Sequence, residues 1–156
     1  MNFARRHLVC GWWFLLVYLF VGLLLEALHG FKFGWYLDVD NEMRRLMLTL
    51  GHAHGTLLAL VNIAMGVTLR SLSSFTLRPS ASFCLVWSAV LLPAGFFLGA
   101  LLPHGGDPGI GVGLVPLGGL MLLYGVGRAA LDLTRSPSFS GDEKRAEGEP
   151  RSRGAR

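Results

Sequence analysis

The sequence predicts an all-α integral membrane protein, a bundle of four membrane-spanning helices with both chain termini in the cytoplasm. Two observations predict this class. First, 52% of the 156 residues are hydrophobic and only 15% are charged, whereas soluble domains carry about 25% charged residues. Second, four stretches supply most of the roughly 20 consecutive apolar residues that a spanning helix needs. The length suits a single domain.

The four apolar stretches predict helices at about residues 8–28, 46–69, 83–102 and 110–131. The first stretch follows Arg5 and Arg6 in the manner of a secretory signal. Its apolar part is longer than the roughly 7–15 residues of a signal, and no small-residue cleavage site follows it, so we expect a retained anchor. The four helices form one transmembrane domain over residues 1–134. Residues 135–156 are mostly Ser, Gly, Pro, Glu and Arg, which predicts a disordered cytoplasmic tail.

Lysine and arginine residues predict the orientation of the chain. Eleven of the 14 lie on the side that holds the N-terminus, the second connection and the tail, and the other side holds Lys32, Arg44 and Arg45. By the positive-inside rule the richer side is cytoplasmic, and we expect a multi-pass protein of the cell inner or plasma membrane. The net charge of +4 comes from these flanks and the tail, so no nucleic-acid partner is expected.

Small and polar residues mark the helix faces that should face the bundle. The first helix carries such residues at spacings of three and four, namely Gly11, Leu15, Tyr18, Gly22, Glu26 and His29. In the second helix, small or polar residues fall within about 40° of one line, namely Gly51, Gly55, Ala59, Asn62 and Gly66. This pattern is typical of close helix packing, with Asn62 as the expected hydrogen-bonding residue between helices.

The third and fourth helices carry residues that shape the backbone. Pro93 should leave the Ala89 carbonyl without its helical partner, which is a way to form a cavity. The fourth helix is rich in glycine. These glycines either let neighbouring backbones pack closely or leave room for a flat cofactor. The glycine-rich faces are also where a membrane partner or a second copy of the chain would pack.

Four of the five histidines are predicted at the outer end of the bundle, namely His29, His52, His54 and His104. Ionisable side chains are costly in lipid, so several at one depth indicate a site. Neutral imidazole ligates transition metals and haem, and these four histidines are therefore the candidate metal ligands. His52, His54, His104 and Asn62 are the candidate cofactor-binding residues. His52 and His54 lie about 200° apart around their helix, so the two cannot point the same way.

Glu26 and His29 form a Glu-x-x-His pair, the spacing that supplies paired ligands in metal-binding helical bundles. Such bundles carry two copies of the pair, and this sequence has one. The alternative is an interfacial Glu and His at a helix end. His7 lies on the opposite membrane side beside Arg5 and Arg6, and it is not a candidate.

The stretch from His52 to Gly66 (HAHGTLLALVNIAMG) resembles a pattern found in small four-helix membrane proteins related to hydroxylaminobenzene mutase and in haem–copper-oxidase-like membrane proteins. The resemblance covers about fifteen residues of the second helix. It implies that His52 or His54 would be the residue to inherit haem ligation. The full histidine set of an oxidase core is absent, and mutase chemistry would convert a hydroxylamino arene to an aminophenol.

We therefore expect a small polytopic membrane protein with a His/Glu-lined pocket near the outer membrane face. The pocket would bind haem, a transition metal or a small apolar substrate. Whether the protein is an enzyme is left open; if it is a mutase-like isomerase, Glu26 and His54 are the candidate catalytic residues that move protons. The alternative is a non-catalytic membrane subunit or assembly factor whose histidines only hydrogen-bond between helices.

Overall fold

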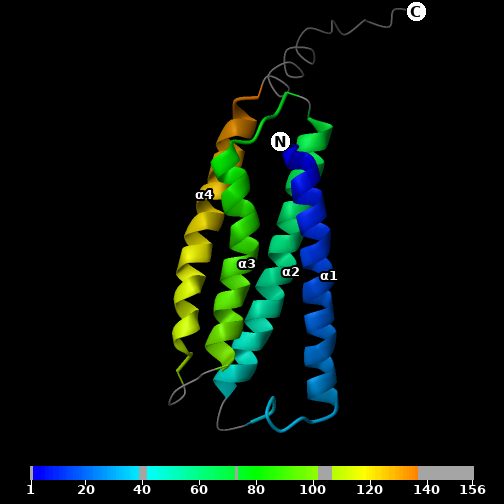
Figure 1. Cartoon of the computed structure of the whole chain (residues 1–156), viewed down its shortest axis with the longest axis vertical. Helices are drawn as coiled ribbons and strands as arrows, with labels where there is room; N and C mark the ends of the chain where they lie inside the picture. Colours follow the sequence, from blue (N-terminus) through cyan, green and yellow to red (C-terminus); the bar gives the residue numbers. More distant parts are fainter. Residues whose placement is uncertain (1, 39–41, 73, 102–106, 137–156) are drawn as a thin grey trace, which may run out of the picture.

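The computed structural model describes residues 2–38, 42–72, 74–101 and 107–136. Within these ranges the chain forms four long α-helices, with a short 3₁₀ turn before the last one (Figure 1). The bounds are α1 Phe3–Gly30, α2 Glu42–Ser71, α3 Pro79–Leu101, η2 Ile110–Gly113 and α4 Leu114–Thr134. All four predicted helices are confirmed. The predicted tail, apart from its first two residues, lies outside the described residues.

The first three helices begin four or five residues before the apolar stretches that predicted them. At the start of α1, the side-chain oxygen of Asn2 accepts a hydrogen bond from the backbone N–H of Arg5 at 3.1 Å. This is a helix cap, which satisfies a donor that the first turn would otherwise leave free. At the start of α3, Pro79 occupies the first helical position, where its missing N–H costs nothing. The apolar pattern marks the part of each helix suited to lipid, and the caps mark where the helix begins.

The helices pack mainly against their neighbours in sequence, α1 on α2, α2 on α3 and α3 on α4. They alternate in direction, so the start of α1 and the end of α4 lie at the same end of the molecule (Figure 1). No extensive packing joins α1 to α4, which lie at opposite edges of the described array. The helices thus form an open, up-and-down array, whereas a closed bundle would bring α1 and α4 together.

All four helices are long and apolar enough to cross a membrane. In the most apolar 18-residue window, 56% of α3 and 33% of α2 is buried, against 17% of α1 and 11% of α4. The outer helices therefore expose large apolar side chains, among them Trp13, Phe20 and Leu23 on α1 and Leu120 and Leu123 on α4. Such continuous apolar surface suits lipid rather than water, and the chain has the character of a membrane protein.

The small residues of α2 face its neighbours, as the sequence predicts. A Cβ atom added at Gly55 would overlap the Tyr18 ring, and one added at Gly51 would lie 2.7 Å from the Phe97 ring. Between α3 and α4, the space beside Gly125 of α4 is likewise occupied by the Leu85 side chain of α3. At these positions the space beside the glycine holds a side chain of the next helix, so the packing interpretation is confirmed there and no room is left for a flat cofactor.

α3 continues as a helix through Pro93, and a side chain of α1 takes the hydrogen bond that proline removes. Proline has no N–H to donate to the carbonyl four residues earlier, which here belongs to Ala89. The Tyr18 hydroxyl donates to that carbonyl at 2.7 Å, and Tyr18 is buried. The Ala89 carbonyl is thus satisfied by a contact between α1 and α3 rather than by opening a cavity.

We expect Tyr18→Phe to lower the free energy of unfolding by about 1 kcal/mol, because the substitution removes one hydrogen bond and leaves a buried carbonyl unpaired. Heat denaturation of the detergent-purified protein, followed by circular dichroism, measures the change. Tyr124→Phe is the matched control, since the Tyr124 hydroxyl bonds Ser80 at the exposed surface. Equal stabilities of the two variants would contradict this role for Tyr18.

Candidate functional site

His52 lies between α2 and α1, well inside the helix array. Its Nδ1 is 2.8 Å from the backbone carbonyl of Tyr18, and because a carbonyl only accepts, Nδ1 carries the proton and donates. Its ring lies on Gly22, where an added Cβ would meet the ring atom Cε1. At 1.5 Å per residue, Gly22 is about 10 Å deeper along α1 than His29. The prediction that these histidines share one depth at the outer end is therefore wrong for His52.

His54 faces the other neighbour of α2. Its Nδ1 donates to the carbonyl of Leu50 in its own helix at 2.9 Å, and its ring lies 4.9 Å from the ring of Phe96 on α3. His52 and His54 thus point to opposite sides of α2, as the helical geometry predicts. His52 bonds between helices, which is the packing role that the alternative function gave to the histidines.

The predicted metal ligands do not come together in the part of the chain that the structure describes. Within the described ranges, no group of three or more His, Cys, Asp or Glu side chains could hold a metal ion. His29, His52 and His54 lie at separate places, and His104 lies outside the described residues. Haem or metal binding by this set therefore has no support in the described geometry.

Glu26 departs from the face of α1 that the sequence assigns to it. The predicted stripe holds through Gly11, Tyr18 and Gly22, but Glu26 is exposed on α1 and the buried line passes through Leu25 instead. His29 is also exposed. The prediction of a bundle-facing side chain is therefore wrong for Glu26, whereas the His29 ring lies against Tyr36 of the connection to α2. Glu26 does not line the pocket between the end of α1 and the start of α2, whereas His29 does.

A buried polar cluster joins α1, α2 and α3 toward the end of the array where α1 begins, and it contains His7, which was not a predicted site residue. His7 has no exposed surface. Its Nδ1 is 2.8 Å from Oδ1 of Asn62 on α2, and its Nε2 is 2.9 Å from the Ser82 hydroxyl on α3. With the amide oriented in this way, Nδ1–H donates to Asn62 and Nε2 accepts from Ser82.

Asn62 is the centre of this cluster. Its amide N–H groups donate to the carbonyls of Leu58 at 2.9 Å and Leu85 at 3.2 Å, so the residue bonds α1, α2 and α3 at once. The predicted role of Asn62 as a hydrogen-bonding residue between helices is confirmed. All of its polar atoms have partners within the protein, and none is directed to a cavity. His7 was detectable from sequence, because it lies four residues before Gly11 and continues the same helical stripe.

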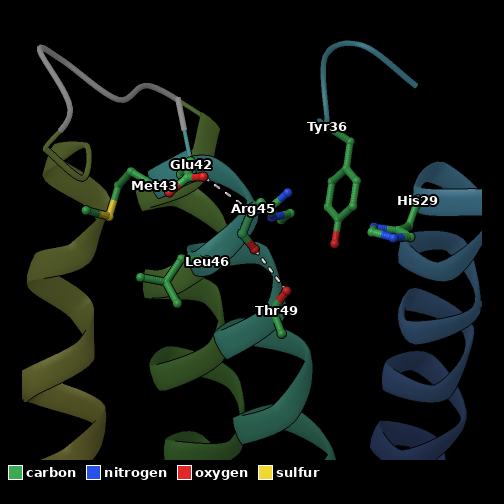
Figure 2. Close-up of a pocket in the computed structure, with 7 residues that line it drawn as sticks. All are labelled: His29, Tyr36, Glu42, Met43, Arg45, Leu46 and Thr49. Atoms are coloured by element: carbon green, nitrogen blue, oxygen red, sulfur yellow. Dashed lines mark hydrogen bonds and ion pairs between the residues drawn. The ribbon is translucent and has the colours of Figure 1, made fainter. Parts of the chain in front are cut away.

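A pocket lined by both polar and apolar side chains lies where α1 ends and α2 begins. It has a volume of about 570 Å³. Figure 2 shows the Tyr36 ring between His29 of α1 and Arg45 of α2, with its hydroxyl pointing toward the body of the array. The lining residues are His29, Tyr36, Glu42, Met43, Arg45, Leu46 and Thr49. We call this the loop-end pocket.

The connection from α1 to α2 folds so that Tyr36 turns back over the pocket. Lys32 has a left-handed backbone with φ of 52°, a conformation common where helices end. Beyond it, the N–H groups of Tyr36 and Leu37 both donate to the carbonyl of Phe33 at 3.0 Å. Only 5% of Tyr36 is exposed. The ring is therefore held in place by the loop rather than by a regular helix.

Arg44 fixes this loop to the first turn of α2. Its guanidinium donates to the carbonyl of Trp35 at 2.9 Å and lies 4.8 Å from the centre of the Trp35 ring. It also pairs with Asp38 at 3.7 Å. Because Trp35 directly precedes Tyr36, these contacts also restrain the position of Tyr36. The residues that form the pocket therefore follow no helical or strand repeat in the sequence.

The polar groups of the loop-end pocket are largely free to bind a ligand. The His29 ring and the Tyr36 ring meet edge to face with centres 6.5 Å apart, but neither side chain has a hydrogen-bond partner among the described residues. Arg45 has only a loose ion pair with the exposed Glu42, at 3.8 Å. The Thr49 hydroxyl donates to the Arg45 carbonyl and keeps its lone pairs. The pocket therefore offers donors and acceptors beside apolar Met43 and Leu46.

The resemblance drawn from His52 to Gly66 stays a prediction. His52 and His54 each donate Nδ1–H to a backbone carbonyl, and Nε2 of each has no hydrogen-bond partner among the described residues. This is the tautomer in which imidazole ligates through Nε2. However, the spaces beside the flanking Gly51 and Gly55 are occupied by the rings of Phe97 and Tyr18. Comparison of the chain with protein-family models, curated proteins and solved structures finds no match.

Proposed function

We propose that this chain is a multi-pass membrane protein that binds a small, mostly apolar molecule with one oxygen-bearing polar group in the loop-end pocket. The observation that carries the proposal is a set of polar side chains there that form no hydrogen bond with another side chain or backbone group of the described residues. The Tyr36 hydroxyl, the His29 ring and the loosely paired Arg45 guanidinium all line one space of about 570 Å³. A ligand oxygen would accept from Tyr36 and Arg45, while its apolar part would lie on Met43 and Leu46.

The position of the pocket supports entry of such a ligand from the membrane. The same connection exposes Phe31 at 86%, Phe33 at 56% and Trp35 at 44%, and aromatic rings of this kind favour the headgroup region of a bilayer. With both termini in the cytoplasm, as the distribution of Lys and Arg favours, the pocket opens on the outer side. An apolar molecule dissolved in the bilayer would reach it without crossing the membrane core.

Naphthalene and 1-naphthol test the proposal, because they differ only in one hydroxyl. We expect calorimetric titration of the detergent-purified protein to show 1-naphthol binding several-fold more tightly. Tyr36→Phe should weaken 1-naphthol binding about 5-fold, since one hydrogen bond is worth about 1 kcal/mol. Naphthalene binding should not change in this variant.

Tyr124→Phe is the matched control, since this tyrosine lies on α4 and bonds Ser80 far from the pocket. It should leave both affinities unchanged. Equal affinity of the wild type for the two probes, or an equal loss in both tyrosine variants, would contradict a site at Tyr36. Circular dichroism of each variant separates a lost contact from a lost fold.

A further inference from the structure

Two further pockets lie beside the start of α1, at the end of the array opposite the loop-end pocket. One, of about 470 Å³, lies between α1 and α2 and is lined by Asn2, Ala4, Arg5, Leu8, Val9 and Arg70. The other, of about 410 Å³, is lined by Asn2, Arg5, Arg6, Val9 and Cys10. They share Asn2, Arg5 and Val9 and are therefore adjacent, and we call the two together the arginine groove.

A close approach of two helices forms the floor of this groove. A Cβ atom added at Gly66 of α2 would lie 2.7 Å from the Leu8 side chain, 2.9 Å from the Leu8 nitrogen and 3.1 Å from the Ala4 carbonyl of α1. The backbones therefore almost touch at Gly66. Arg70 is one helical turn beyond Gly66 on α2, so the groove between the helices is lined by Arg5 from α1 and by Arg70 from α2.

The charges in the groove have no counterpart within the described protein. Arg5, Arg6 and Arg70 form no ion pair with a described residue, whereas Arg44, Arg45 and Arg128 each pair with a carboxylate. Among the described residues, no Asp or Glu lines either pocket. The other lining residues are mostly apolar and continue along α1 toward the membrane interior. Three cations at the mouth of an apolar groove complement a molecule with an anionic head and a hydrocarbon chain.

We propose that the arginine groove binds one anionic phospholipid. The guanidinium groups of Arg5 and Arg70 hold the phosphate, since planar guanidinium groups bind phosphate through two parallel hydrogen bonds. Arg6 adds charge from the neighbouring pocket, and an acyl chain lies along Leu8 and Val9. Basic pockets between membrane helices on the cytoplasmic side bind anionic headgroups in this way. This site is at the opposite end from the loop-end pocket and does not depend on it.

Native mass spectrometry of the full chain in a neutral detergent tests this site. Phosphatidylglycerol and phosphatidylcholine with identical acyl chains are added, and the retained lipid is counted. We expect one phosphatidylglycerol to be retained at about 10-fold lower concentration than phosphatidylcholine. The double variant R5Q/R70Q should lose this preference, since each basic residue near an anionic headgroup contributes about a several-fold gain in affinity.

The variant R78Q/R135Q is the matched control. It removes the same charge at the same end, but these arginines line a separate pocket that also contains Asp132, so the preference should persist. R5K/R70K should keep part of it. Equal retention of the two lipids by the wild type would overturn the proposal, as would an equal loss in both glutamine variants. Competition by glycerol phosphate as strong as that by the whole lipid would show a free-anion site and overturn it as well.

Discussion

Replacing Asn62 by leucine is expected to lower the free energy of unfolding by about 2 kcal/mol, because a buried donor left unpaired costs about 1–3 kcal/mol. Leucine keeps the volume of the side chain but cannot accept from His7, which has no exposed surface. It also removes the bond to the Leu85 carbonyl on α3. Unfolding of the detergent-purified protein in increasing dodecyl sulfate, followed by tryptophan fluorescence, measures the loss.

The double variant His7→Leu/Asn62→Leu gives a sharper result than the single one. Removing both partners leaves neither His7 nor Asn62 with a group that lacks the other, and the Ser82 hydroxyl loses its acceptor in the His7 single variant and in the double variant alike. The loss of stability in the double variant should therefore be smaller than the sum of the two single losses by about 1 kcal/mol. Ser88→Ala is the control, since Ser88 is equally buried but bonds only Leu85 in its own helix. Additive losses would mean that His7 and Asn62 do not depend on each other.

The helices were predictable because apolarity over about 20 residues is a local property of the chain. The small face of α2 was predictable for the same kind of reason, since Gly51, Gly55 and Gly66 repeat with the helical period. The depth of a residue is not local. His52 lies beside Gly22 rather than level with His29 because the packing of α1 on α2 sets their relative height. No spacing within one helix contains that information.

The loop-end pocket shows the same limit. His29 was among the predicted residues, but Tyr36 and Arg45 were not, because their positions follow from a left-handed turn at Lys32 and from the contact of Arg44 with Trp35. Neither feature has a period. His7 was missed for a different reason. Its neighbours Arg5 and Arg6 are charged residues typical of the segment before a membrane span, so His7 was assigned to that segment although it lies on the buried face of α1.

Two adjacent glycines of α4 are expected to respond to the same substitution in opposite ways. A Cβ atom added at Gly118 would lie 2.6 Å from the backbone nitrogen and 2.9 Å from the Cα atom of Leu92. Backbone atoms cannot move aside as a side-chain end can, so Gly118→Ala should force α4 away from α3. We expect it to lower the free energy of unfolding by roughly 1–3 kcal/mol, as overpacking does.

Gly119→Ala is the matched variant, because nothing lies within 4 Å of a Cβ atom at Gly119. Alanine restricts the unfolded chain and favours the helix, so this change should be neutral or stabilise the protein by up to about 1 kcal/mol. The same unfolding measurement compares the two variants directly. If both alanines had the same effect, the contact of α3 with α4 at Gly118 would not determine stability. A loss confined to Gly118 would mean that backbone contact between α3 and α4 holds α4 to the edge of the array, because α4 has no extensive packing against α1.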